Sequence, residues 1–167
     1  MTITLIGMPA VGKSCMGRHL SRKLNMRVID GDRLIEQVTA RKLQDIINED
    51  GLDAFKAIEE QILLSIDEDN VIIAPGGSAV YYPSVMEHFK SKGIVVYLYA
   101  SVETIIERLG DFSRRGVALK PGQTINDLYL ERAPLLEKYA DVTVNCDGNA
   151  FPKYHAEAFA KISNMLK

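Results

Sequence analysis

The sequence predicts an α/β fold, a three-layer sandwich in which helices cover both faces of a five-stranded parallel sheet. Five short apolar segments mostly lack the alternation of half-exposed strands, and helical segments separate them. Strands that are buried on both faces have this composition. A glycine-rich loop also joins the first apolar segment to a helical one, as in many folds of this class.

Length and composition restrict the possibilities further. The 167 residues suit one domain spanning 1–167. Hydrophobic residues make up 47% and charged residues 25% of the chain, which excludes disorder as the main state. The formal net charge of −2 argues against a broad nucleic-acid-binding surface. No signal-peptide pattern or apolar run of about 18 residues is present, so we expect a cytoplasmic monomer without membrane contact.

The first half of the chain contains three expected strands and four expected helices. We expect strands over 2–6, 28–29 and 71–74 and helices over 14–24, 33–38, 44–48 and 53–66. In the longest of these helices, Asp53 is the expected N-cap. Phe55, Ile58 and Ile62 follow it at helical spacing, which predicts one buried face.

The second half continues the alternation. We expect strands over 94–99 and 142–144 and helices over 83–89, 102–109, 123–139 and 154–166. Pro83 suits a first helical turn, whereas Pro134 is expected to bend or break its helix. Residues 110–122 combine glycines, a proline and several cations, which predicts an exposed, mobile loop.

The glycine-rich loop fits G-x-x-x-x-G-K-[ST] at every fixed position, reading Gly-Met-Pro-Ala-Val-Gly-Lys-Ser over 7–14. Such a loop turns backbone N–H groups and a helix N-terminus toward phosphates. Its lysine reaches the β- and γ-phosphates, and its hydroxyl can bind Mg²⁺. The alternative is a glycine turn with a chance Lys-Ser. The residues predicted to bind ATP here are Gly7, Ala10, Val11, Gly12, Lys13, Ser14 and Cys15.

Two carboxylates follow the second strand, in Asp30-Gly31-Asp32. Asp30 can support the Mg²⁺ shell, and Asp32 can accept a hydrogen bond from a substrate hydroxyl. The alternative for Asp32 is that it caps the following helix. No guanine-recognition motif accompanies the loop, so a small-molecule kinase is favoured over a GTPase.

With these motifs placed, the chain resembles the shikimate kinase family. That family also carries a Phe-Arg-x-x-Glu helix, a Gly-Gly-Gly turn, an Arg-Pro lid and an Arg-x-Pro-x-Tyr helix, in this order. The resemblance implies the sheet order 2-3-1-4-5, a lid at about 110–122 and an acceptor-binding region at about 31–60. The matching stretches are Phe55-Lys56-Ala57-Ile58-Glu59, Gly76-Gly77-Ser78, Arg115-Gly116 and Arg132-Ala133-Pro134-Leu135-Leu136.

The resemblance also implies roles. Lys13, Asp32 and the lid residue Arg115 are implied to be catalytic, with Arg114 a rival for Arg115. Arg108 and Pro152 are implied to hold the adenine, and the alternative for Arg108 is a solvated helix face. The residues implied to bind the acceptor are Asp32, Lys56, Gly76, Gly77, Ser78 and Arg132. For Arg132 the alternative is a surface ion pair.

The departures from the family pattern lie on the acceptor side. Lys56 replaces an arginine and loses its planar two-point grip on a carboxylate. Ser78 replaces a glycine, and its side chain either clashes or offers a hydrogen bond. Gly116 replaces the lid proline, and Leu136 replaces a tyrosine.

Several functions therefore stay open. The chain is expected to phosphorylate a hydroxyl of a small carboxylate-bearing metabolite, shikimate first, using ATP and Mg²⁺. The alternatives are a kinase for another hydroxy acid such as gluconate, and a non-catalytic ATP-binding module. Two features receive structural interpretations: Tyr81, Tyr82 and Met86 are expected in the core, and Cys15 is expected to be a small buried residue.

Overall fold

The structure is a computed structural model that describes residues 1–110, 117, 119–148 and 150–167. Its centre is a parallel sheet with the strand order β2-β3-β1-β4-β5, as the sequence predicts. β1 pairs with β4 from Thr2↔Gly93 to Gly7↔Leu98. The strands are β1 (Thr2–Gly7), β2 (Arg27–Asp30), β3 (Val71–Ala74), β4 (Gly93–Tyr99) and β5 (Val142–Asn145).

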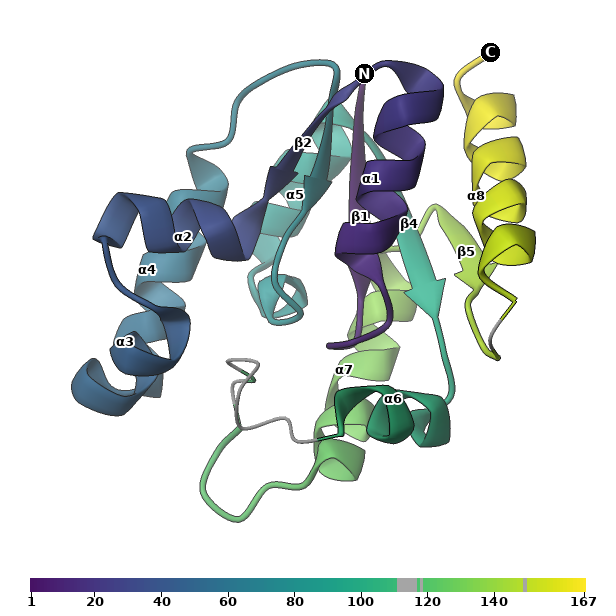
Figure 1. Ribbon diagram of the computed structural model, residues 1–167. Coiled ribbons are helices and arrows are strands. Elements are labelled where there is room, and N and C mark those ends of the chain that lie inside the picture. The colour runs from purple at the N-terminus through teal and green to yellow at the C-terminus, as the bar shows by residue number, and fades with distance from the viewer. Residues whose placement is uncertain (111–116, 118, 149) are drawn as a thin grey trace.

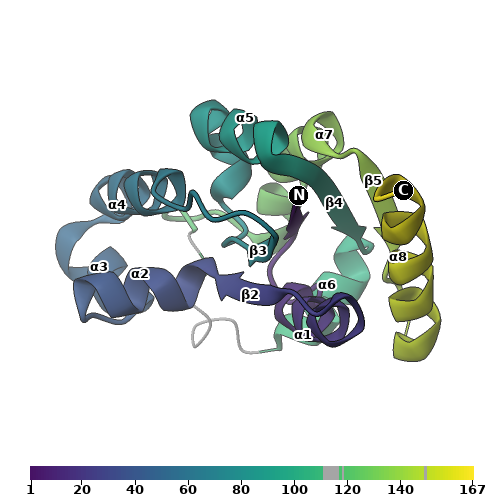
Figure 2. The same cartoon turned by 90° about the horizontal axis from the view of Figure 1, so that it is seen from above.

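Helices cover both faces of this sheet, so the predicted three-layer sandwich is confirmed (Figure 1). Figure 2 shows α5 and α7 on one face and α1 on the other, and α8 packs beside α1. Among the described residues, none of the helices combines the length and apolarity needed to cross a bilayer. The helices are α1 (Lys13–Leu24), α2 (Gly31–Thr39), α3 (Leu43–Asp50), α4 (Leu52–Leu64), α5 (Pro83–Lys92), α6 (Val102–Leu109), α7 (Ile125–Tyr139) and α8 (Phe151–Met165), with a 3₁₀ turn at Ala79–Tyr81.

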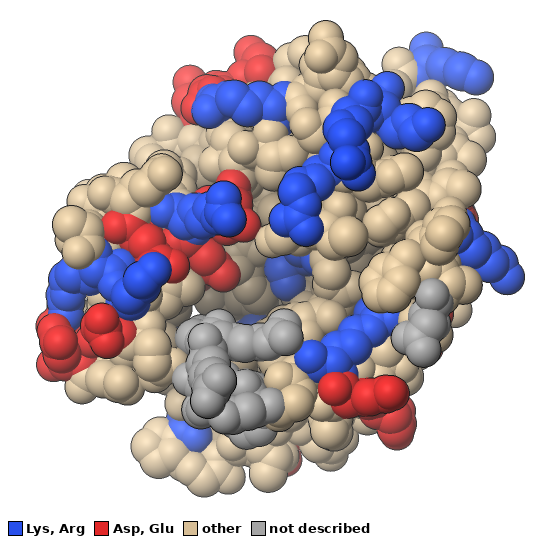
Figure 3. All heavy atoms as spheres, in the orientation of Figure 1, with Lys and Arg blue, Asp and Glu red and all other residues tan. Residues whose placement is uncertain are grey.

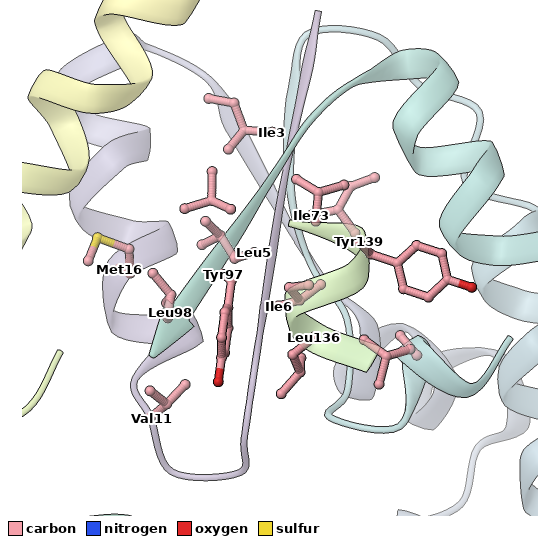
Figure 4. Close-up of a cluster of buried hydrophobic side chains, with 14 of the residues drawn as sticks. Ile3, Leu5, Ile6, Val11, Met16, Ile73, Tyr97, Leu98, Leu136 and Tyr139 are labelled. Carbon is pink, nitrogen blue, oxygen red and sulfur yellow. The ribbon is translucent and has the colours of Figure 1, made fainter. Parts of the chain in front are cut away.

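The main core lies around β1 and β4. All six residues of β1 are buried, and side chains from the helices pack against them from both faces (Figure 4). Val11 of the glycine-rich loop and Met16 of α1 belong to this core. Burial of these apolar side chains ties the loop to the sheet, which holds the loop at the carboxyl end of β1.

Helices α2, α3 and α4 form a smaller unit with its own apolar cluster. The buried members of this cluster are Ile35, Leu43, Ile46, Phe55 and Ile62. The unit projects from the β2 side of the sheet (Figure 1) and coincides closely with the expected acceptor-binding region, 31–60. Because its helices pack on a separate apolar cluster, this unit forms a subdomain beside the sheet.

The expected N-cap of α4 is wrong, and of the two outcomes expected at Pro134 the break does not occur. Asp53 is not the N-cap of α4, because Gly51 takes that position with φ 92° and Asp53 lies in the first turn. Glycine adopts that positive φ freely, so α3 and α4 can meet there without a longer loop. Pro134 does not break α7, which continues from Ile125 to Tyr139. The carbonyl that loses its donor belongs to Leu130, an exposed residue, where water can replace the missing hydrogen bond.

Candidate active site

A cavity of about 510 Å³ opens at the carboxyl ends of β1, β2 and β3. Ligand sites of open α/β sheets lie at this edge. Figure 3 shows a hollow between the α2–α4 unit and the body of the sheet, with atoms of Lys or Arg residues visible inside it in blue. Ten predicted site residues line the cavity: Ala10, Gly12, Lys13, Ser14, Cys15, Asp32, Gly76, Gly77, Ser78 and Arg132.

The glycine-rich loop has the backbone that a phosphate cradle needs. Ala10 and Gly12 have positive φ angles of 64° and 106°. Alternation of this kind turns successive N–H groups toward one side. Gly7 has a different role, because a Cβ there would lie 2.8 Å from the Leu98 carbonyl oxygen. The first glycine therefore permits close packing against β4, and the later residues shape the loop.

Lys13 folds back onto its own loop. Its ammonium donates hydrogen bonds to the carbonyl oxygens of Gly7 at 3.0 Å and Met8 at 2.9 Å. Burial lowers the pKa of Lys13 to about 8, against the opposing effect of the Asp32 carboxylate. Burial likewise raises the pKa of Asp32, and the Lys13 charge counteracts that shift. The two charges stabilise each other in a site where water alone solvates them poorly.

Ser14 and Asp30 are hydrogen-bonded to each other, and their oxygen atoms could hold a metal ion together. The Ser14 hydroxyl donates to Oδ2 of Asp30 at 3.1 Å. The other oxygen of Asp30 accepts from the backbone N–H of Arg33 at 3.2 Å, so Asp30 is the N-cap of α2. The alternative reading of Asp32 as that cap is therefore wrong: the helix begins at Gly31, which leaves Asp32 in the first turn and facing the cavity.

The glycine pair after β3 lets acceptor-side groups approach the backbone. A Cβ on Gly76 would lie 2.8 Å from Oδ1 of Asp32 and 2.9 Å from Oε2 of Glu59. A Cβ on Gly77 would lie 2.6 Å from Nη1 of Arg132. Any larger residue at either position would displace a charged group from the cavity wall.

Arg132 is buried, with only 2% of its surface exposed. This excludes the alternative that it forms a surface ion pair. It comes from α7 and reaches the same cavity as Lys13 and Asp32. A guanidinium held in such a wall presents a planar set of donors, which matches a carboxylate.

Ser78 joins a buried hydrogen-bond network. Its hydroxyl donates to Oε1 of Glu59, and the Tyr82 hydroxyl donates to the same oxygen at 2.8 Å. Burial raises the pKa of Glu59, and the two hydroxyl donors oppose that rise. Of the two outcomes expected for Ser78, the structure contains the hydrogen bond: the side chain turns to Glu59 on α4.

Lys56 and Tyr81 occupy the region behind the cavity wall. Lys56 does not line the cavity; its ammonium lies 5.3 Å from the centre of the Tyr81 ring. Tyr82 and Met86 are buried in the core as expected. Tyr81 is half-buried and packs against the core as expected, and it also contacts two cations. Its hydroxyl accepts a hydrogen bond from Nε of Arg132 at 3.2 Å.

Arg108 links the glycine-rich loop to the start of α8. Its guanidinium donates to the carbonyl oxygens of Val11 at 3.3 Å, Cys146 at 2.7 Å and Gly148 at 2.6 Å. It also lies 5.8 Å from the centre of the Phe151 ring. The solvated-face alternative for Arg108 is therefore wrong. Pro152 sits in the first turn of α8 and lines a separate groove beside α1.

Sequence reasoning missed two residues of this site and misjudged a third. Arg18 lines the cavity, and its position one helical turn after Ser14 is a signal that could have found it. Glu59 was quoted within its motif without a role. Cys15 is half-buried and lines the cavity, so it is not the fully buried residue expected. Arg114 and Arg115 lie outside the described residues.

Comparisons with known proteins agree on one family. The family model described as shikimate kinase matches residues 9–167. A shikimate kinase of Paracidovorax citrulli is 34% identical over 150 residues, covering 87% of this chain and 82% of that protein. The solved shikimate kinase from Acinetobacter baumannii in complex with shikimate has a TM-score of 0.87 and 30% identity, covering 99% and 95% of the two chains. A gluconokinase from Sinorhizobium meliloti, with a TM-score of 0.57, 19% identity and coverage of 98% and 91%, shares the fold alone.

Proposed function

The chain belongs to the shikimate kinase family, and on this basis we propose that it transfers the γ-phosphoryl group of ATP to a hydroxyl of shikimate. One observation carries the proposal: Lys13, Asp32 and Arg132, from three separate segments, line a single cavity. These groups supply the three requirements of the reaction, namely a phosphate-binding cation, a proton acceptor and a carboxylate-binding fork.

The nucleotide side is assigned to the loop and its neighbours. The ammonium of Lys13 exchanges its two carbonyl partners for phosphate oxygens, which restores the solvation that burial removes. Arg108 and the first turn of α8, with Pro152, are proposed to hold the adenine, since Arg108 donates to the loop and lies against Phe151 of that turn. Ser14 and Asp30 are paired hard oxygen ligands and suit Mg²⁺. When bound, this ion neutralises charge on the β- and γ-phosphates.

The acceptor side is assigned to Asp32, Arg132 and the Gly76-Gly77 turn. Arg132 binds the acceptor's carboxylate with its terminal nitrogens, next to the Gly77 backbone. Asp32 faces the reacting hydroxyl and accepts its proton; its pKa, raised by burial, makes it a better base than an exposed carboxylate. Glycines at 76 and 77 leave space for both groups to approach the ligand. Catalysis then consists of positioning and charge neutralisation.

Two other functions are less well supported. A gluconate kinase shares only the fold with this chain, at 19% identity. A non-catalytic ATP-binding module would not need Asp32 and Arg132, two charges that are hard to solvate, beside the phosphate loop. Their presence in one cavity favours catalysis.

The proposal also covers the lid, the oligomeric state and the location of the protein. The lid function of 110–122 and the role of Arg115 stay predictions, because residues 111–116 and 118 are outside the described chain. We also propose that the protein is a monomer. A cytoplasmic location is also proposed, and the free thiols of Cys15 and Cys146 suit that reducing compartment.

The test is detection of the product. Mg-ATP and shikimate are incubated with the protein, and ³¹P NMR should show ADP and a new phosphomonoester in equal amounts. An Asp32→Asn variant retains the shape of the side chain and should slow the reaction about 10²-fold. The proposal fails if the phosphomonoester does not form, or if inorganic phosphate accounts for all the ATP consumed.

A further inference from the structure

Tyr81 contacts two cations that come from distant positions in the chain. It ends the 3₁₀ turn Ala79–Tyr81, directly after the Gly-Gly-Ser turn. The Lys56 ammonium of α4 lies over its ring at 5.3 Å, and the Arg132 guanidinium of α7 lies over it at 5.2 Å, both measured to the ring centre. Arg132 lines the cavity and is assigned to the acceptor's carboxylate, and the family resemblance implies the same role for Lys56. Neither Lys56 nor Tyr81 lines the cavity itself.

The contact with Arg132 controls how the guanidinium is presented. Nε donates to the Tyr81 hydroxyl at 3.2 Å, and among the described residues this is the guanidinium's only hydrogen bond. Because Nε is bonded to the Tyr81 hydroxyl, the two terminal nitrogens are left for a ligand. Of these, Nη1 faces the Gly77 backbone. A guanidinium is planar, so one hydrogen bond and one ring contact fix the orientation of its fork.

The contact with Lys56 compensates for a flexible side chain. A lysine side chain has a flexible stem of four carbons, and its ammonium cannot bind a carboxylate at two points as a guanidinium does. Within the described part of the chain, the Lys56 ammonium has no hydrogen bond or ion pair, so the Tyr81 ring is its partner. An attraction of this type restrains the ammonium beside the Tyr81 ring without neutralising it. The charge therefore stays available to an anionic ligand.

We propose that Tyr81 is a positioning residue of the acceptor site, holding Arg132 by its hydroxyl and Lys56 by its ring so that both cations can bind one carboxylate. This inference rests on the proposed function for the identity of the acceptor, but the arrangement of the two cations does not depend on it. A tyrosine that served only as filler at the core edge would make its hydroxyl dispensable, which gives the proposal a clear alternative.

The experiment compares Tyr81→Phe, which keeps the ring, with Tyr81→Leu, which removes both contacts. The matched control is Tyr129→Phe, because Tyr129 also lies outside the cavity and its hydroxyl donates to Ala100. We expect the KM for shikimate to rise about 5-fold in Tyr81→Phe and about 30-fold in Tyr81→Leu. The KM for ATP should change less than about 2-fold, and kcat should stay within about 3-fold of the wild type.

The outcomes separate this inference from the proposed function. Equal KM values for shikimate in Tyr81→Phe, Tyr129→Phe and the wild type would overturn the positioning role. A fall in kcat together with a similar rise in the KM for shikimate and for ATP, in variants that still fold, would also overturn it. If the wild type phosphorylates no acid, the proposed function fails, and NMR of ¹⁵N-arginine-labelled protein decides the inference. A slowly exchanging Arg132 Nε–H signal that Tyr81→Phe shifts or broadens supports it, and an unchanged signal refutes it.

Discussion

The nucleotide side and the acceptor side of the cavity are built in different ways. The phosphate-binding part of the nucleotide side comes from one continuous segment, 7–15, which matches its motif at every fixed position. The acceptor side combines α2, α4, the turn after β3 and α7, and it departs from the family pattern at Lys56, Ser78 and Leu136. Local sequence thus determines one half of the site, and tertiary packing determines the other.

The departures come with local partners, which suggests that the acceptor side is rearranged and not decayed. Ser78 donates to the buried Glu59, and Lys56 lies against Tyr81. A buried carboxylate without such donors would be costly. The comparison therefore predicts large effects for changes on the nucleotide side and graded, acceptor-specific effects on the other side.

The largest effect is expected for Lys13→Ala. Without this ammonium the developing charge on the transferred phosphoryl group loses its main cation, so kcat should fall about 10³-fold. The thermal midpoint should not fall, because the buried charge is destabilised in the wild type. Coupled ADP release and a thermal melt measure the two quantities. Near-normal turnover would show that the loop does not hold the transferred phosphate.

Arg132→Ala should act on the acceptor alone. Loss of a charged two-point contact should raise the KM for shikimate about 10²-fold. The KM for ATP should not increase, since the Arg132 charge lowers the pKa of Lys13 and its removal favours the protonated ammonium. Steady-state kinetics with each substrate varied in turn measure this. Arg132→Lys is the control, with an intermediate effect expected; an equal rise of both KM values would contradict the division into two sides.

Lys56→Arg tests whether the acceptor side tolerates its departure from the family. A guanidinium restores the planar grip, so the KM for shikimate should fall about 3-fold. Lys138→Arg is the matched control, because Lys138 lies over the Tyr139 ring at 5.2 Å and does not line the cavity. A rise in the KM for shikimate in Lys56→Arg would mean that the contact with the Tyr81 ring requires a lysine at this position.

The smallest effect is a change in how stability depends on pH. Burial raises the pKa of Glu59 above its ordinary 4.5. The stability gained from the protonated form is complete below pH 4.5 and disappears as the pH rises through the folded-state value. The glutamine in Glu59→Gln cannot lose a proton. The free energy of unfolding of this variant, relative to that of the wild type, should therefore increase with rising pH, by at most about 1.4 kcal/mol per pH unit. Urea titrations at several pH values measure this. A constant difference would mean that Glu59 has its ordinary pKa.

The fold was predictable because its signals are local and strong. The uninterrupted apolar runs of β3 and β4 identify buried parallel strands, and the motif over 7–14 identifies the loop. The failures are also physical. At Gly51 a glycine with positive φ replaced the expected Asp53 cap, and at Pro134 an exposed helix face accommodated the proline. Such outcomes depend on neighbouring backbone that one residue does not reveal.

The candidate site was predictable only where a motif covers it. The resemblance to a family named Asp32, Arg132 and the glycine turn, and the structure brings them to one cavity. Tyr81 was expected in the core together with Tyr82 and Met86, and it does pack against the core. Its contacts with Lys56 and Arg132 span 25 and 51 positions along the chain, and no local pattern encodes pairs so distant.

The most direct test compares acceptors in one assay. ADP release from Mg-ATP is measured with shikimate, quinate, gluconate and no acceptor, and kcat/KM is determined for each acid. The account predicts that shikimate is phosphorylated well above the blank and has the highest kcat/KM. ADP release at the blank rate with shikimate, while Mg-ATP still binds, would contradict it, and so would a higher kcat/KM for another acid.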